Sequence, residues 1–322
     1  MTERPRLSVV LPVFNEARGL PELLARLDRL EGRLADLDLE VILVDDHSTD
    51  ECPALLRQAR AARPNLRVLR LSRNSGSHVA IYAGLEHATG DAAVFLASDL
   101  QDPPELILEL VRRWRDGGQI VWAVRERREG LSLIDRLFIR LYYFVVIHVC
   151  RVTLPPEGSD FALLDRCVVD ALLRNCGAQP SLGADIAVLG FRQERVPYCK
   201  VARKYGRSKW TLRKKLRAFV DVVVKFSYEP IRLMSGLGIA VSLVGFLYAA
   251  MQIVRRVFFD IGIEGWTTIV VAVFMLSGFQ MIMLGIIGEY LCRALRESGR
   301  RPLYFIEPEA GAGNGGAGTD DE

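Results

Sequence analysis

Two long uncharged stretches near the C-terminal end of the sequence constrain the fold most strongly. One is Leu233–Val254, which has 22 residues, and the other is Trp266–Gly288, which has 23 residues. At about 1.5 Å per helical residue, each is long enough to cross a hydrocarbon core of about 30 Å. We therefore expect two transmembrane helices. The alternative is a pair of buried core helices, which would require two consecutive uncharged helices after an already complete domain.

Basic residues are concentrated on the outer flanks of these two stretches. They are Arg203, Lys204, Arg207, Lys209, Arg213, Lys214, Lys215 and Arg217 upstream, and Arg293, Arg296, Arg300 and Arg301 downstream. The loop between the stretches has Arg255 and Arg256 balanced by Asp260 and Glu264. Because cytoplasmic flanks carry the excess of Lys and Arg, we expect a multi-pass protein of the inner or plasma membrane, with the N-terminal domain in the cytoplasm.

The residues before Arg125 alternate between short apolar runs and amphipathic stretches. The runs predict strands at Leu7–Val13, Glu40–Val44, Leu66–Leu71, Ala92–Ala97 and Ile120–Val124, and the stretches predict helices at Pro21–Leu37, Pro53–Ala62, His78–Ala88 and Pro103–Arg115. Repeated units of this kind indicate an α/β domain whose mostly parallel sheet is flanked by helices. A composition that is 50% hydrophobic also excludes a disordered or collagen-like chain.

Polar side chains follow four of the predicted strands at the points where the strands end. They form the clusters Asn15-Glu16, Asp45–Asp50, Ser72–Asn74 and Ser98–Asp102. Ligands of open α/β sheets bind beyond the carboxyl ends of the strands, so we expect these clusters to share one cleft.

The acidic residues of these clusters predict a site for a phosphorylated ligand. A carboxylate at a strand end, such as Asp99, is a suitable ligand for a Mg²⁺ or Mn²⁺ ion that bridges a diphosphate. Helix capping accounts for Ser48–Asp50 but not for the doubled Asp45-Asp46, which can accept hydrogen bonds from a base or a ribose. None of the predicted strands is followed by G-x-G-x-x-G, and the sequence contains no G-x-x-x-x-G-K-[ST], which argues against a Rossmann dehydrogenase and a P-loop ATPase.

Six short motifs occur in the order found in family 2 glycosyltransferases. They are Pro12–Glu16, Val44–Asp50, Ser72–Gly76, Ala88–Asp91, Ser98–Glu105 and Arg203–Trp210. The chain most resembles the polyprenyl-phosphate glycosyltransferases, relatives of dolichol-phosphate mannose synthase, and Gly285–Tyr290 followed by Arg301–Tyr304 extends this resemblance to the C-terminal region. It implies a GT-A fold and inverting transfer of a sugar from a UDP- or GDP-sugar to a polyprenyl phosphate such as undecaprenyl phosphate.

The resemblance also implies roles for individual residues. Pro12, Phe14, Glu16 and Asp46 would contact the nucleoside, and Asp99 and Gln101 would hold the metal on the diphosphate. We also place Asp45, Asn74 and Ser98 at the donor site, whereas His78 would either reach the diphosphate or be structural. Arg203 and Lys209 would face phosphate. Asp160 would orient the acceptor phosphate or stabilise positive charge on the sugar, or it is a surface or capping residue. The candidate catalytic residues are thus Asp99, Asp160, Arg203 and Lys209.

Three positions depart from the family pattern. Ala97 stands where the family commonly has the first Asp of Asp-Ala-Asp, which puts metal affinity or sugar preference in doubt. His47 stands where Gly is usual, and Ser159 precedes Asp160 where Gly is usual.

The expected organisation has four parts. A cytoplasmic glycosyltransferase domain covers 1–202, a basic juxtamembrane region 203–232, two transmembrane helices with a short outward loop 233–292, and a cytoplasmic tail with a disordered end 293–322. The expected partners are membrane lipid, further copies of the chain in a homotetramer, a flippase and a downstream transferase, without nucleic acid. Two alternative functions remain open. One is an inactive membrane scaffold, supported by Ala97 alone, and the other is a processive polysaccharide synthase, whose Q-x-x-R-W motif is absent from the sequence.

Overall fold

The computed structural model describes residues 4–126, 160–177, 180–201, 229–259, 265–298 and 302–308. These residues belong to two compact units. The first unit contains the described residues up to 201 together with 302–308, and the second contains those of 229–298. Arg203, Lys209 and Ser159 lie outside the described residues.

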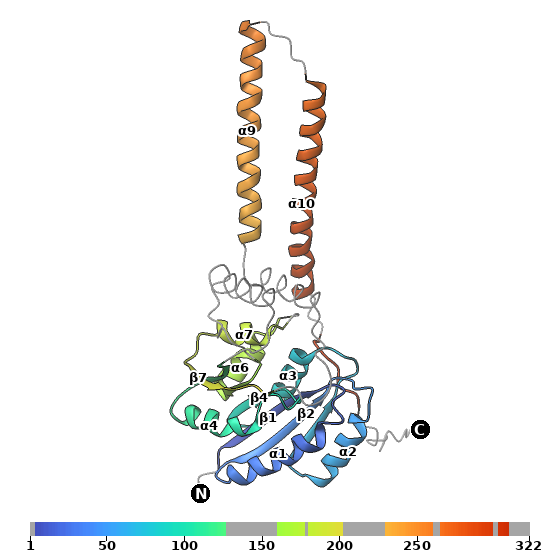
Figure 1. Ribbon diagram of the computed structural model, residues 1–322, viewed down its shortest axis with the longest axis vertical. Helices are drawn as coiled ribbons and strands as arrows, with labels where there is room; N and C mark the ends of the chain where they lie inside the picture. Colours follow the sequence, from blue (N-terminus) through green and yellow to red (C-terminus); the bar gives the residue numbers. More distant parts are fainter. Residues whose placement is uncertain are drawn as a thin grey trace, which may run out of the picture. The chain divides into compact units, whose positions relative to one another are not determined.

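A seven-stranded sheet forms the centre of the first unit, with the strand order β3-β2-β1-β4-β6-β5-β7 (Figure 1). Its strands are β1 (Arg6–Val13), β2 (Asp38–Asp45), β3 (Leu66–Arg70), β4 (Ala92–Phe95), β5 (Ile120–Arg125), β6 (Ala162–Asp165) and β7 (Gln193–Tyr198). Strand β6 runs antiparallel to β4 and β5, and the other pairs are parallel. The prediction of an α/β domain with a mostly parallel sheet is confirmed.

Helices cover both faces of this sheet. Helices α1 (Leu20–Arg33), α2 (Cys52–Ala62) and α4 (Ile107–Arg115), the last preceded by a 3₁₀ turn at Pro104–Leu106, pack on one face, and α3 (Ser77–Glu86), α6 (Arg166–Arg174) and α7 (Leu182–Val188) pack on the other. Strand β1 contributes Leu7, Val9 and Leu11 to the first core and Val10 to the second. This alternation follows from the twofold period of a strand and explains why β1 is apolar on both faces.

A short C-terminal segment, Pro302–Pro308, belongs to the same unit as the sheet. Ile306 forms an antiparallel bridge with Leu71, just beyond β3. The N–H of Ser72 donates to the carbonyl of Phe305 at 2.9 Å, and the N–H of Glu307 donates to the carbonyl of Arg70 at 2.8 Å. The chain therefore returns to the edge of the sheet after its last helix.

The second unit consists of two long helices, α9 (Glu229–Phe259) and α10 (Trp266–Ser298). Among the described residues, the window Met275–Cys292 in α10 has the length and hydropathy of a membrane span, whereas α9 contains a shorter apolar stretch, Met234–Tyr248. Large apolar side chains such as Phe246 and Met281 are exposed. The unit thus presents apolar surface of the kind that contacts lipid, and the expectation of two spans stays a prediction.

Candidate active site

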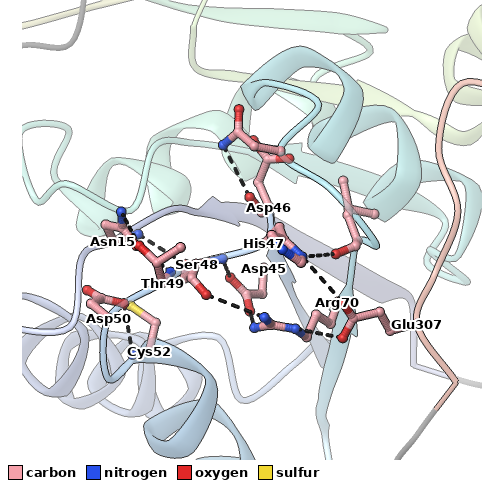
Figure 2. A network of polar contacts seen from close by, with 12 residues as sticks. Asn15, Asp45, Asp46, His47, Ser48, Thr49, Asp50, Cys52, Arg70 and Glu307 are labelled. Carbon is pink, nitrogen blue, oxygen red and sulfur yellow. Dashed lines mark hydrogen bonds and ion pairs between the residues drawn. The ribbon is translucent and has the colours of Figure 1, made fainter.

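The loops that follow β1 and β2 are held together by reciprocal hydrogen bonds (Figure 2). The N–H of Asn15 donates to Ser48 Oγ at 3.0 Å, and the N–H of Thr49 donates to Asn15 Oδ1 at 2.8 Å. Asn15 has a φ of 54°, a left-handed conformation that Asn tolerates better than most residues. Two of the predicted polar clusters therefore form one rigid edge.

Asp45 ends β2, and its side chain is only 1% exposed. One carboxylate oxygen accepts the N–H of Ser48 at 2.9 Å, and the other pairs with the Arg70 guanidinium at 2.5 Å. A buried carboxylate needs such partners because its desolvation is costly. Both carboxylate oxygens of Asp45 thus accept hydrogen bonds from the protein, and the bond from Ser48 fixes the loop that contains Asp46.

Asp46 connects this loop to the one that follows β3. Its carboxylate accepts the N–H groups of Ser75 at 2.6 Å and Gly76 at 2.9 Å, and its own carbonyl accepts the Asn74 amide at 3.2 Å. Burial raises the pKa of the Asp46 carboxyl, although these backbone donors oppose the shift. The structure therefore brings Asn74 and Asp46 together, and their role at a donor site stays a prediction.

His47 has a backbone conformation that favours Gly, the residue that the family resemblance predicts at this position. Its φ is 59°, in the left-handed region that favours Gly. The His47 Nδ1 atom lies 3.2 Å from the carbonyl of Leu71 and 3.3 Å from the Glu307 carboxylate. Because both partners are acceptors, the proton is assigned to Nδ1, and these contacts compensate for the unfavourable backbone.

The loop after β4 contains the predicted metal ligands. The Ser98 hydroxyl donates to the carbonyl of Pro12 at 2.8 Å, which connects this loop to the end of β1. Asp99 Oδ1 accepts the N–H of Gln101 at 3.1 Å, and the intervening Leu100 has a φ of 59°. A left-handed Leu costs about 1–2 kcal/mol, and such strain concentrates at functional sites.

A buried polar network lies next to the Asp99 loop. The Asp102 carboxylate, which is 0% exposed, accepts the Tyr198 hydroxyl at 2.5 Å and the Lys200 ammonium at 3.3 Å. Burial and the neighbouring Asp102 carboxylate raise the pKa of Tyr198, which keeps its hydroxyl protonated as a donor. The N–H of Val201 also donates to the carbonyl of Gln101 at 3.0 Å. The residues that follow β7 are thereby hydrogen-bonded to the loop that contains Asp99.

Asp160 lies at the beginning of the β6 region and pairs with Arg125 from the end of β5 at 2.8 Å. Its side chain is 60% exposed, whereas that of Arg125 is 18% exposed. The pair thus presents an accessible carboxylate beside a partly buried guanidinium, at the edge where β5 ends.

The residues that could hold a divalent cation are few. No group of three or more His, Cys, Asp or Glu side chains with metal-binding geometry occurs in the part of the chain that the structure describes. Asp102 is engaged by Tyr198 and Lys200. The Asp99 carboxylate and the Gln101 amide of the same loop carry oxygen atoms of the kind that bind Mg²⁺ or Mn²⁺. This small oxygen set fits Mg²⁺ or Mn²⁺ if a diphosphate supplies further oxygens, as is common for nucleotide sites.

The structure also shows where the other predicted site residues lie. Phe14 and Glu16 are half-buried after β1, and the N–H of Glu16 contacts Cys52 Sγ at 3.3 Å. His78 is in the first turn of α3, with its Nδ1 atom 3.4 Å from the carbonyl of Pro180. Sequence reasoning missed Arg125, although the rule of strand carboxyl ends points to it at the end of β5.

The family model described as "Glycosyl transferase family 2" matches residues 8–173. A protein of Bacillus subtilis named "Uncharacterized glycosyltransferase YkcC" is 34% identical over 98% of this chain and 97% of its own length. A Klebsiella pneumoniae protein named "Undecaprenyl-phosphate 4-deoxy-4-formamido-L-arabinose transferase" is 32% identical over 94% of this chain and 93% of its own length.

Two further proteins are similar to this chain. The "Bactoprenol glucosyl transferase" of Shigella phage SfV is 29% identical and covers 94% of this chain and 99% of its own length. Among solved structures, glucosyl-3-phosphoglycerate synthase from Mycobacterium tuberculosis in complex with Mn²⁺, UDP and phosphoglyceric acid is 22% identical, with a TM-score of 0.48 over 69% of this chain and 78% of that one.

Proposed function

Because the chain belongs to glycosyl transferase family 2 and is a glycosyltransferase, we propose that it transfers a sugar from a nucleoside-diphosphate sugar to a polyprenyl phosphate. The observation that carries the proposal is the similarity to undecaprenyl-phosphate and bactoprenol transferases, which extends over 94% of the chain and so includes its C-terminal helices. A lipid acceptor also accounts for the exposed apolar side chains of α9 and α10.

The donor would bind along the carboxyl ends of β1, β2 and β4. In this arrangement Pro12, Phe14, Glu16 and Asp46 contact the nucleoside, and the Asp99 loop faces the diphosphate. Asp99 and Gln101 would hold a divalent cation there. Such an ion, when bound, neutralises the negative charge that develops on the departing diphosphate. The hydrogen bond from Ser98 to Pro12 supports this arrangement, because it connects the Asp99 loop, which would face the diphosphate, to the end of β1, which would contact the nucleoside.

The acceptor would approach the opposite part of the same edge, where Arg125 and Asp160 lie. A phosphomonoester has a second pKa of about 6, so a polyprenyl phosphate is mostly dianionic at neutral pH and requires little help from a general base. The protein would align an acceptor oxygen for in-line attack on the anomeric carbon, which inverts its configuration. Asp160, oriented by Arg125, would stabilise positive charge on the sugar ring, and Arg203 and Lys209 would face phosphate.

The proposal includes a membrane arrangement. Helices α9 and α10 would both span the membrane with the glycosyltransferase domain on the cytoplasmic face, because the flanking basic residues favour that side. Two helices offer little path for moving a sugar across the bilayer. A flippase and a second transferase on the far side would therefore use the lipid-linked product, and a homotetramer would bury more helix surface in the membrane.

The test is transfer by purified full-length protein. Undecaprenyl phosphate, Mg²⁺ or Mn²⁺ and a panel of UDP- and GDP-sugars are supplied, and glycolipid and released nucleoside diphosphate are measured. We expect product with at least one donor, and its loss with EDTA. No product with any donor, from folded protein that also binds no nucleotide, would favour the inactive scaffold instead.

The Asp99→Ala variant tests the metal assignment. We expect at least a hundredfold loss of kcat, because a proposed metal ligand is removed, with unchanged thermal unfolding. Asp116→Ala is the matched control, since Asp116 is an exposed carboxylate in the turn after α4. Wild-type turnover in Asp99→Ala would refute the assignment.

A further inference from the structure

The C-terminal segment, Pro302–Pro308, contacts the loop that carries the donor-site carboxylates (Figure 2). The Glu307 carboxylate accepts the Arg70 Nε–H at 2.8 Å, and it also lies 3.3 Å from His47 Nδ1. Arg70, at the end of β3, pairs with Asp45, and His47 directly follows Asp46. One carboxylate from the last described segment therefore touches the donor loop directly at His47 and reaches it a second time through Arg70.

The first contact controls the orientation of Arg70. This guanidinium uses one edge for Glu307 and its Nη1 atom for the buried Asp45, while Nη2 lies 3.4 Å from the carbonyl of Ser48. A planar guanidinium that is held on one edge has its remaining donors fixed in direction. Glu307 thus fixes the donors that hold Asp45, and Asp45 in turn accepts the N–H of Ser48.

The second contact acts on His47, the residue that directly follows Asp46. His47 occupies the left-handed region, where a non-glycine residue is at a disadvantage. Its side chain is held between Leu71 at the end of β3 and Glu307 from the C-terminal segment. Loss of the Glu307 contact would free the loop at the point where its backbone is least favourable.

We propose that Glu307 is a positioning residue for nucleoside binding, acting through Arg70 and His47 on Asp45 and Asp46. The inference rests on the proposed function, in which Asp46 contacts the nucleoside. It extends the donor site to a residue that follows both long helices in the chain. Glu307 does not touch the substrate, so its effect appears in donor affinity.

The test compares Glu307→Gln with Tyr304→Phe in the full-length protein. The Tyr304 hydroxyl donates to Glu86 at 2.5 Å, so Tyr304→Phe loosens the same segment without touching the donor loop. We expect Glu307→Gln to raise the Kd for UDP or GDP and the KM for the nucleotide sugar about three- to tenfold, because the orienting charge is lost. The KM for polyprenyl phosphate and the Kd for inorganic pyrophosphate should not change, and Tyr304→Phe should leave all four constants unchanged.

A purely structural role for Glu307 predicts a different result. Both variants would then lower the thermal midpoint and leave the Kd for the nucleotide unchanged, which would overturn the inference. Equal weakening of nucleotide and pyrophosphate binding would also overturn it. Wild-type protein that binds nucleotide but transfers no sugar to undecaprenyl phosphate would refute the proposed acceptor, whereas the nucleotide-binding comparison would still decide the role of Glu307.

Discussion

Tyr198→Phe should destabilise the first unit by removing the hydrogen bonds of its hydroxyl. The lost hydroxyl donates at 2.5 Å to Asp102, whose side chain is 0% exposed, and accepts the Arg125 Nε–H at the longer distance of 3.5 Å. A hydrogen bond to a buried charged group contributes about 1.5–3 kcal/mol, and no water replaces it at a fully buried oxygen. The ring packs edge to face on Phe161 with centroids 6.2 Å apart, and Phe preserves that packing. We therefore expect a loss of about 2 kcal/mol.

Thermal unfolding followed by tryptophan fluorescence measures this loss. For a domain of this size, about 2 kcal/mol corresponds to a fall of about 4–8 °C in the unfolding midpoint. Tyr82→Phe is the matched control, since its hydroxyl donates at 3.1 Å to the half-buried Asp185, which also accepts the N–H of Ser181. The control should lose about 1 kcal/mol or less. Equal midpoints for wild type and Tyr198→Phe would refute the contribution assigned to the hydrogen bond between Tyr198 and Asp102.

Two other predictions concern packing and pH. Gly90→Ala should lower the free energy of unfolding by about 2 kcal/mol in denaturant titration, because a Cβ atom there would lie 2.7 Å from the carbonyl of Ala92 and 2.7 Å from the N–H of Ser8. Gly32→Ala, with open space around its Cβ position, is the control and should be neutral or stabilising. The Arg26 side-chain hydrogen bonds hold the pKa of Glu105 below its ordinary value of 4.5. This stabilisation is present above about pH 4.5 and is lost as the pH falls through the lower, folded pKa, so Glu105→Gln should flatten the acid limb of stability against pH. An unchanged acid limb would contradict this.

The first five strands and the polar edge could be predicted from the sequence because the signals are local. Continuous apolar runs mark strands covered on both faces, and polar residues mark the points where such strands end. The rule predicts Asn15, Asp46 and Asp99 at one edge of the sheet, and in the structure they follow the parallel strands β1, β2 and β4. It would also have found Arg125 had it been applied to the fifth predicted strand.

The remaining features depend on contacts between distant residues. Strand β6 has only four residues and continues directly into α6, so it shows no period of its own. Arg70 and Glu307 are 237 residues apart, and nothing near either residue in the sequence indicates the other. The end of α1 at Arg33 was also missed, because Leu34 and Leu37 stay buried after the helix stops and continue its apolar pattern.

The reversed direction of β6 has a consequence for how this architecture can diversify. Strand β5 ends, and β6 begins, at the same edge of the sheet, because the two are antiparallel. A segment of any length inserted between them therefore leaves from and returns to the side where Arg125 and Asp160 lie, without disturbing β1, β2 or β3. Variation in the length of that interval is therefore expected to alter the surroundings of Arg125 and Asp160 and to leave the other end of the sheet unchanged.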